Sequence, residues 1–100
     1  MNMNIDRIDA NISSYERAID GRNNTIAKLK VAKTKYASVF TELDKFDKDN
    51  VILACQNLRR NINNKISAID NEIRHLESLN KNASEEISTL ERQKNDTMNE

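Results

Sequence analysis

Apolar residues recur every seven positions along the first half of the chain. One row holds isoleucine or phenylalanine, and a second row of leucine, isoleucine or tyrosine follows it by three positions. The first row is Ile5, Ile12, Ile19, Ile26 and Phe40, and the second is Ile8, Tyr15, Leu29, Tyr36 and Leu43. In the heptad notation abcdefg these are a and d positions, and they predict one helix over about residues 4–46 with a single apolar stripe, the first seam. Lys33 interrupts this seam at an a position and Arg22 at a d position.

A second seam begins after residue 50 and predicts a second helix over about residues 50–96. Its a positions are Ile52, Ile66, Ile73 and Ile87, and its d positions are Cys55, Ile62, Ile69, Leu76, Ala83 and Leu90. Three polar residues, Arg59, Asn80 and Lys94, also fall at a positions. Buried polar residues at a positions reduce stability and can fix the register between two helices.

The polar stretch 44–50 separates the two seams. Counting on by sevens from Phe40 reaches Asp47, and from Leu43 reaches Asn50, so the first seam does not continue into the second. The stretch also lies at the midpoint of the chain, so two arms of equal length can cover each other. These observations favour a helical hairpin over one continuous helix, which the absence of Gly and Pro around residue 48 would otherwise allow.

The sequence therefore predicts an all-α fold, an antiparallel two-helix hairpin of coiled-coil type that forms a single domain over residues 1–100, with a turn at about 47–49. Asp47, Asp49 or Asn50 could each cap the start of the second helix. Two bare helices bury little surface against an ordering cost of roughly 1.5 kcal/mol per residue. We therefore expect the hairpin to be part of a larger helical bundle, made with a partner or with copies of itself.

Three local features leave alternatives open. Gly21 and the asparagines after it could kink the first helix or be tolerated within it. The stretch Asn80–Glu85 could end one helix and cap another, although we favour a continuous helix. A dense apolar patch near the turn could be a core plug between the helices or a docking surface for a partner. This patch consists of Val39, Phe40, Leu43 and Phe46.

Charge and composition narrow the kind of partner. Sixteen basic residues balance sixteen acidic ones, whereas nucleic acids and anionic membranes require a strong positive field, so we expect a protein partner and no nucleic acid. No window approaches eighteen apolar residues, so we expect no membrane span. The N-terminus lacks the basic and apolar regions of a signal peptide, so we expect a cytoplasmic protein, or one that is exported without a signal peptide.

The sequence contains no motif for catalysis or for ligand binding. There is no glycine-rich phosphate loop, no set of His, Cys and acidic residues with metal-ligand spacing, and no nucleophile beside a base. The single cysteine, Cys55, fits a small core residue at a d position, and the single histidine, His75, fits the rim of the seam. We therefore predict a non-enzymatic protein with no catalytic residue, cofactor or metal site.

The helical pattern resembles the small helical proteins of type VII secretion. The run from Ile12-Ser13-Ser14-Tyr15 to Ala32-Lys33, followed by the closely spaced isoleucines of 62–76, is similar to the helical partners of LXG-type toxins in Gram-positive bacteria, over most of the chain. The Trp-x-Gly turn of the related ESX proteins is absent because the chain has no Trp. Neither Tyr15 nor Tyr36 is followed four residues later by Asp or Glu, so that export signal is missing. Phe40-Thr41-Glu42-Leu43-Asp44 does match the Phe-x-x-x-Asp motif that some of these partners use for targeting.

The resemblance implies a helical adaptor that binds a helical cargo, an LXG-type toxin, and targets it to a type VII secretion machine. The implied partners are the toxin N-terminal domain and a second small helical protein, and self-association is the other possibility. An alternative function is a structural or scaffolding coiled coil, in a phage or a cytoskeletal assembly, without cargo. Phe40 and Asp44 are the candidate targeting signal. The candidate partner-binding residues are Ile12, Ile19, Ile26, Leu29, Ile62, Ile66, Ile69, Ile73 and Leu76.

Overall fold

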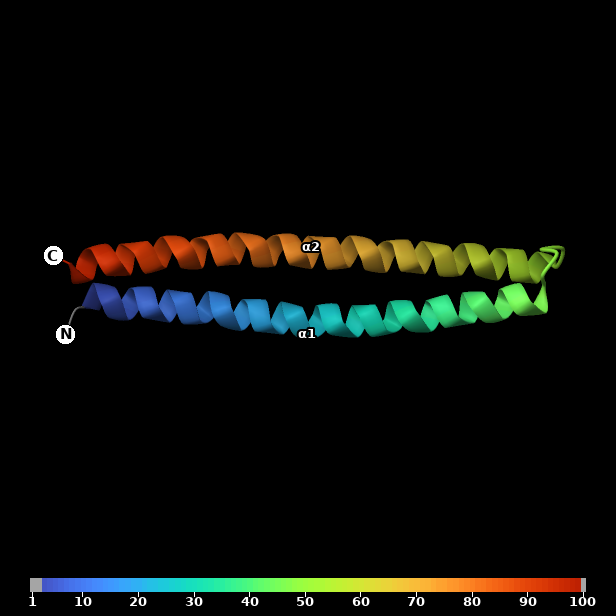
Figure 1. Cartoon of the computed structure of the whole chain (residues 1–100), viewed down its shortest axis with the longest axis horizontal. Coiled ribbons are helices and arrows are strands. Elements are labelled where there is room, and N and C mark those ends of the chain that lie inside the picture. The colour runs from blue at the N-terminus through green and yellow to red at the C-terminus, as the bar shows by residue number, and fades with distance from the viewer. Residues whose placement is uncertain (1–2, 100) are drawn as a thin grey trace. The chain divides into compact units, whose positions relative to one another are not determined.

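The chain folds into two helices that pack against each other in a hairpin, in a computed structural model that describes residues 3–99 (Figure 1). Helix α1 is Met3–Phe46 and helix α2 is Leu53–Met98. The described residues contain no strand, so the predicted all-α hairpin is confirmed. Both helices persist because each carries a heptad pattern along its length, with few polar interruptions, and no proline.

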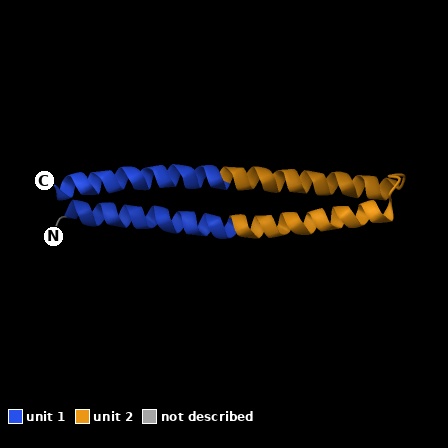
Figure 2. Ribbon diagram, in the orientation of Figure 1, with its two compact units in different colours: residues 1–25, 76–100 blue, residues 26–75 orange. Residues whose placement is uncertain are grey.

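The hairpin divides into two compact units (Figure 2). In the first, which we call the terminal unit, residues 3–25 pair with residues 76–99. The second, the turn unit, is residues 26–75 and contains the connection between the helices. Each unit consists of one stretch of α1 packed on one stretch of α2. The expectation that residues 1–100 form a single domain stays a prediction.

The connection between the helices is longer than the sequence predicted. Helix α1 ends at Phe46 as expected, and α2 begins at Leu53, three residues after the predicted start at about residue 50. The connection is therefore 47–52, and the predicted turn at about 47–49 lies within it. The connection is longer because the Asp47 carboxylate accepts hydrogen bonds from the backbone N–H groups of Val51 and Ile52, which holds these residues outside the helix. Asn50 has a φ of 56°, in the left-handed region that asparagine tolerates better than most residues.

The two stretches at which the sequence allowed a break, Gly21 and Asn80–Glu85, are both helical. Helix α1 continues through Gly21, and the Thr25 hydroxyl donates to the Gly21 carbonyl at 3.2 Å. A Cβ at Gly21 would meet no atom within 4 Å, so no close approach requires a glycine here. Helix α2 continues through Asn80–Glu85, which confirms the continuity favoured from the sequence.

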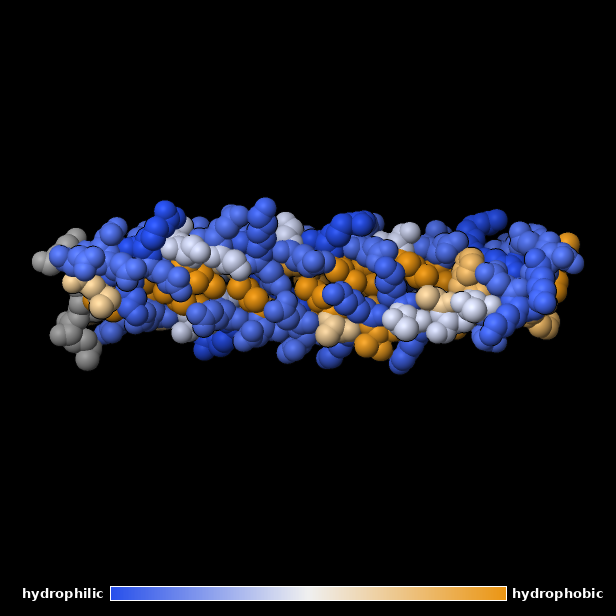
Figure 3. All heavy atoms as spheres, in the orientation of Figure 1, coloured by the Kyte–Doolittle hydropathy of each residue, from blue (hydrophilic) through white to orange (hydrophobic). Residues whose placement is uncertain are grey.

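The core of the hairpin is thin. The buried apolar residues are Ile26, Cys55, Ile62, Ile73 and Ala83, all of them at a or d positions. Ile62, at 4%, is the least exposed of these residues. In Figure 3, apolar atoms show between the two rows of polar atoms on the face drawn. Two helices alone therefore cover their seams only in part.

Candidate partner-binding surface

The polar residues at a positions form cross-helix pairs in a single register. In the turn unit Arg59 binds Asp44 at 3.0 Å and Lys33 binds Asp70 at 2.8 Å. In the terminal unit, the Asn80 side-chain amide donates to Asn23 at 3.0 Å and Lys94 binds Asp9 at 2.8 Å. The residue numbers of every pair add to 103. Each pair joins an a position on one helix to an e position on the other.

The constant sum of the paired residue numbers indicates that the polar a residues favour one alignment of the two helices. The pairs of Lys33 with Asp70 and of Lys94 with Asp9 are partly exposed. Such pairs contribute only about 0–1 kcal/mol each, so their main effect is on register and not on overall stability. A slip of one heptad would place Arg59 opposite Ala37 or Val51, neither of which can accept a hydrogen bond from a guanidinium through its side chain. The prediction that polar a residues fix the register now has named partners for each residue.

Arg59 organises the connection between the helices. Its side chain is 11% exposed and makes five hydrogen bonds, to the side chains of Asp44, Asp47 and Asn50 and to two backbone carbonyls. The carbonyl oxygens belong to Leu43, at 3.2 Å, and to Asp47, at 2.7 Å. They lie at the C-terminal end of α1, where carbonyls lack helical partners and a cation is favourable. A single side chain of α2 thus caps α1 and closes the turn.

Asp47 is the buried acid of this network, with its side chain 1% exposed. Burial alone would raise the pKa of Asp47, but hydrogen bonds from the backbone of Val51 and Ile52 and from Arg59 outweigh it and lower the pKa below its ordinary value. For Arg59, burial favours the neutral form, but the hydrogen bonds to Asp47 and Asp44 outweigh it and raise the pKa. Both groups are therefore charged at neutral pH.

The candidate targeting residues are engaged in the hairpin. Phe40 is half-buried at its a position on the seam, and the Asp44 carboxylate accepts a hydrogen bond from Arg59 Nε at 3.0 Å. Asp44 remains about half exposed, at 55%. Both residues therefore have structural partners, and a targeting role for them stays a prediction.

The candidate partner-binding residues all lie on the seams between α1 and α2. Ile26, Ile62 and Ile73 are buried. The others are half-buried, and they are Ile12, Ile19, Leu29, Ile66, Ile69 and Leu76. The structure thus brings these residues together as the core of the hairpin, and contact with a partner is available only at their exposed margins.

The two sides of the seam differ in the turn unit. On each helix, e positions lie on one side of the a/d stripe and g positions on the other. The e side carries the polar pairs and a groove lined by polar residues such as Gln56, Asn63 and Asn64, and we call it the polar edge. The g side carries the apolar residues Ala32, Val39, Phe46 and Leu58 beside the charged residues Lys65 and Glu72, and we call it the apolar edge.

The apolar edge is open to solvent. Phe46 is 76% exposed, Val39 is 45% exposed and Leu58 is 43% exposed. A shallow groove of about 260 Å³ runs along it, lined by Ala32, Lys35, Tyr36 and Val39. The apolar patch predicted from the sequence is therefore divided, since Phe40 and Leu43 lie half-buried on the seam whereas Val39 and Phe46 face outward. The sequence analysis missed Leu58 as part of this surface.

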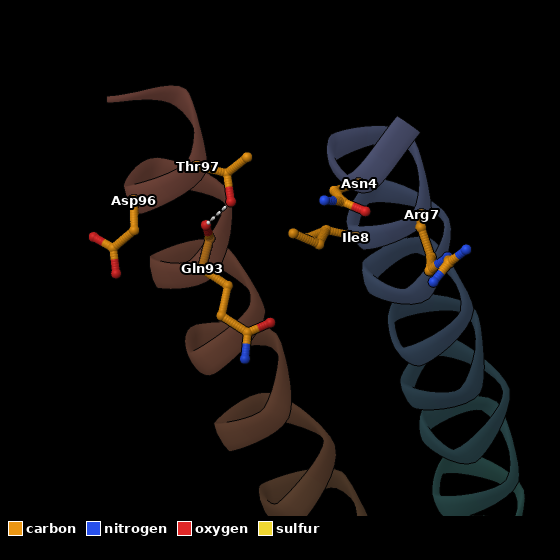
Figure 4. A pocket seen from close by; sticks show the side chains of 6 residues that line it. All are labelled: Asn4, Arg7, Ile8, Gln93, Asp96 and Thr97. Carbon is orange, nitrogen blue, oxygen red and sulfur yellow. Dashed lines mark hydrogen bonds between the residues drawn. The ribbon is translucent and has the colours of Figure 1, made fainter. Parts of the chain in front are cut away.

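The g side of the terminal unit is more polar. Figure 4 shows a groove of about 360 Å³ between Asn4, Arg7 and Ile8 of α1 and Gln93, Asp96 and Thr97 of α2. Ile8 is the one apolar residue of this set, and it points from α1 towards α2 in this view. The Thr97 hydroxyl donates to the Gln93 carbonyl at 2.9 Å. The apolar edge of the turn unit is therefore the stronger candidate for binding another protein.

The single Cys and His are not part of a larger cluster of ligands. Cys55 is buried at its d position and His75 is exposed. Among residues 3–99, no group of three or more His, Cys, Asp or Glu side chains is placed to hold a metal ion. Within the same residues, neither helix is long and apolar enough to cross a membrane.

Comparisons of the chain with models of protein families, with characterised proteins and with solved structures gave no match.

Proposed function

We propose that this chain is a non-enzymatic helical adaptor that binds helices of a partner protein along the apolar edge of the turn unit. The observation that carries the proposal is the exposure of Val39, Phe46 and Leu58 in rows beside a seam that the hairpin covers only in part. Exposed apolar residues that line up beside a core are typical of protein-binding surfaces. A partner that covers them would complete a core that two helices leave thin.

The chemistry of the edge fits an amphipathic helix. Ala32, Val39 and Phe46 follow one another at intervals of seven residues, about 10.5 Å along the helix axis, which is the spacing of the apolar rows on a second helix. Lys35 and Glu42 flank this row one heptad apart. A partner helix with an acid and a base at the matching interval would bind both, and this would specify its direction.

In its finer form, the proposal rests on the resemblance to the helical partners of LXG-type toxins. The partner is then the helical domain of such a toxin, with or without a second small helical protein. The adaptor would hold the toxin helices and escort them to a type VII secretion machine. The apolar edge supplies the binding surface for this role, and the resemblance supplies the identity of the cargo.

The test is photo-crosslinking in the producing cells, with a photoreactive amino acid at Val39 or Phe46 and a control at Ser38. Ser38 is exposed on the same helix but lies at an f position, off the apolar edge. Crosslinks from 39 and 46, but not from 38, to a different helical protein are expected. Crosslinks to copies of this chain alone would favour the scaffold, and equal labelling at all three positions would refute a specific surface.

Substitutions give a second test of the same surface. In a pull-down without crosslinker, Val39→Asp and Phe46→Asp should each lose the partner that photo-crosslinking identified, because burial of an unpaired carboxylate is costly. Ser38→Asp should leave binding unchanged. Helical circular dichroism of the three variants should match that of the parent chain, since all three side chains are exposed.

A further inference from the structure

The connection between the helices is closed by polar contacts and not by apolar burial. Val51 is 75% exposed, Leu53 is 69% exposed and Ile52 is 39% exposed. Arg59 holds the connection through Asp47, Asn50 and the end of α1. The Asp47 carboxylate also accepts from the backbone of Val51 and Ile52, and Gln56 donates to the Asn50 carbonyl. The closed turn therefore leaves its own apolar residues in water, and Arg59 makes the largest share of the contacts that close it.

The contacts between the helices do not depend on which chain supplies each helix. The pairs Lys33 with Asp70 and Asp44 with Arg59 need only an α1 and an α2 in the observed register. An α1 from one copy and an α2 from a second copy satisfy them equally, and the reciprocal pairing follows by symmetry. The a/d contacts of Ile62 and Ile73 would be reproduced in the same way.

The register also fixes where two such copies would meet. Because paired residue numbers add to 103, the two-fold axis of an exchanged dimer would pass midway between residues 51 and 52. The connections of both copies would run beside each other at this axis. Val51 of one copy would then lie opposite Ile52 of the other, and Leu53 opposite Asn50. Apolar surface of Val51 and Ile52 that is exposed in the closed hairpin would be covered.

We propose that the seams are a binding surface for a second copy of this chain, through reciprocal exchange of α2, and that Arg59 is the latch that keeps the monomer closed. The exchanged dimer gains apolar contact at the connection, and the closed monomer keeps the hydrogen bonds of Arg59 to Asp47 and Asn50 in the folded connection. This inference goes beyond the adaptor role and uses different residues from the apolar edge. It can therefore fail while the adaptor proposal stands, and the reverse also holds.

The experiment uses the full chain with Cys55→Ser, Lys33→Cys and Asp70→Cys. Positions 33 and 70 are adjacent across the helices, since Lys33 Nζ lies 2.8 Å from Asp70 Oδ1. Two copies that differ in tag length are mixed, unfolded together, refolded and treated with a short bismaleimide. Crosslinks within one chain report the closed hairpin, and crosslinks between chains that carry different tags report exchange. Sedimentation over a range of concentrations gives the dissociation constant of the dimer.

Arg59→Ala should move the chain from crosslinks within one copy to crosslinks between copies and tighten the dimer by about tenfold or more, because the hydrogen bonds that favour closure are lost. The matched control is Arg60→Ala, which changes an adjacent exposed arginine and should leave the parent pattern unchanged. Asp44→Ala removes a contact that the closed and exchanged forms both make, so it should leave the balance between them unchanged.

A second variant keeps the proposal testable if Arg59→Ala is poorly folded. Deletion of residues 47–51 leaves one residue between the helices, too few for a helical hairpin loop, and places Ile52 seven positions after Phe40, so that both seams run in one heptad register. This variant should be helical, dimeric and crosslinked between copies. The proposal is overturned if the deletion variant is monomeric or loses its helical signal, or if a folded Arg59→Ala variant crosslinks only within one copy at every concentration.

Discussion

Replacement of Ile62 by alanine tests whether the seam is the core of the hairpin. Ile62 is 4% exposed, the lowest value among the described apolar residues. The substitution removes three carbon groups, worth about 0.8 kcal/mol each when buried, or about 2.4 kcal/mol in all. Alanine is a better helix former than isoleucine by roughly 0.4 kcal/mol, which offsets part of this loss. The cavity contribution is small because the thin core borders water and can collapse. The expected cost is therefore about 2 kcal/mol.

Val31→Ala is the matched control on the facing helix. Val31 is 56% exposed, so the two carbon groups removed are less than half covered and contribute about 0.7 kcal/mol. The gain in helix propensity is of similar size, roughly 0.6 kcal/mol, and the net change should be close to zero.

Urea unfolding followed by the helical circular dichroism signal measures both changes as shifts in midpoint at constant slope. The measurement should be repeated at several protein concentrations, because self-association would make the apparent stability depend on concentration. Equal effects of Ile62→Ala and Val31→Ala would refute the reasoning, since the seam would then be no better covered than the outer face of α1.

Three further predictions follow from the polar residues. The pKa of Asp47 is lowered by folding, so the stabilisation from its carboxylate is fully present above the ordinary pKa of 3.8 and is lost as the pH falls below that value. Asp47→Asn should remove this part of the acid dependence in urea unfolding measured at several pH values. A double-mutant cycle on Lys33 and Asp70, whose side chains are 45% and 34% exposed, should give a coupling energy below about 1 kcal/mol that falls with added salt; a larger, salt-independent value would contradict the assignment to a surface pair. Asn80→Leu should raise the urea midpoint by the equivalent of about 1 kcal/mol, because the Asn80 side-chain oxygen is buried without a partner among the described residues. A destabilised variant would show that the hydrogen bond between Asn80 and Asn23 contributes to stability as well as to register.

The heptad pattern predicted the helices because burial of an apolar stripe is the dominant local signal in this chain. The end of α1 at Phe46 followed from the loss of that pattern. The start of α2 could not be predicted in the same way, because Asp47 binds the backbone of Val51 and Ile52 and keeps these two apolar residues outside the helix. This competition depends on the three-dimensional position of a side chain and leaves no periodic trace.

The partners of the polar a residues were hidden for a different reason. Arg59 was identified as an interruption of the seam, but Asp44 lies fifteen residues away on the other helix, and the match is visible only once a register is chosen. A search over hairpin registers for one that gives each polar a residue a polar e residue would have found it. The apolar edge also left a signal, since Val39 and Phe46 are spaced by seven, but next to Phe40 and Leu43 they were grouped into one patch.

The difference between the two edges of the turn unit limits how an assembly built on it can grow. The polar edge is occupied by its own pairs of Lys33 with Asp70 and Arg59 with Asp44, which leaves the apolar edge as the side for recruiting another molecule. A subunit that binds through one surface forms a complex that stops growing when that surface is filled, whereas a filament needs two surfaces on each subunit. Through the apolar edge the chain would act as a terminating component, and mass measurements should find one bound partner per chain at every concentration.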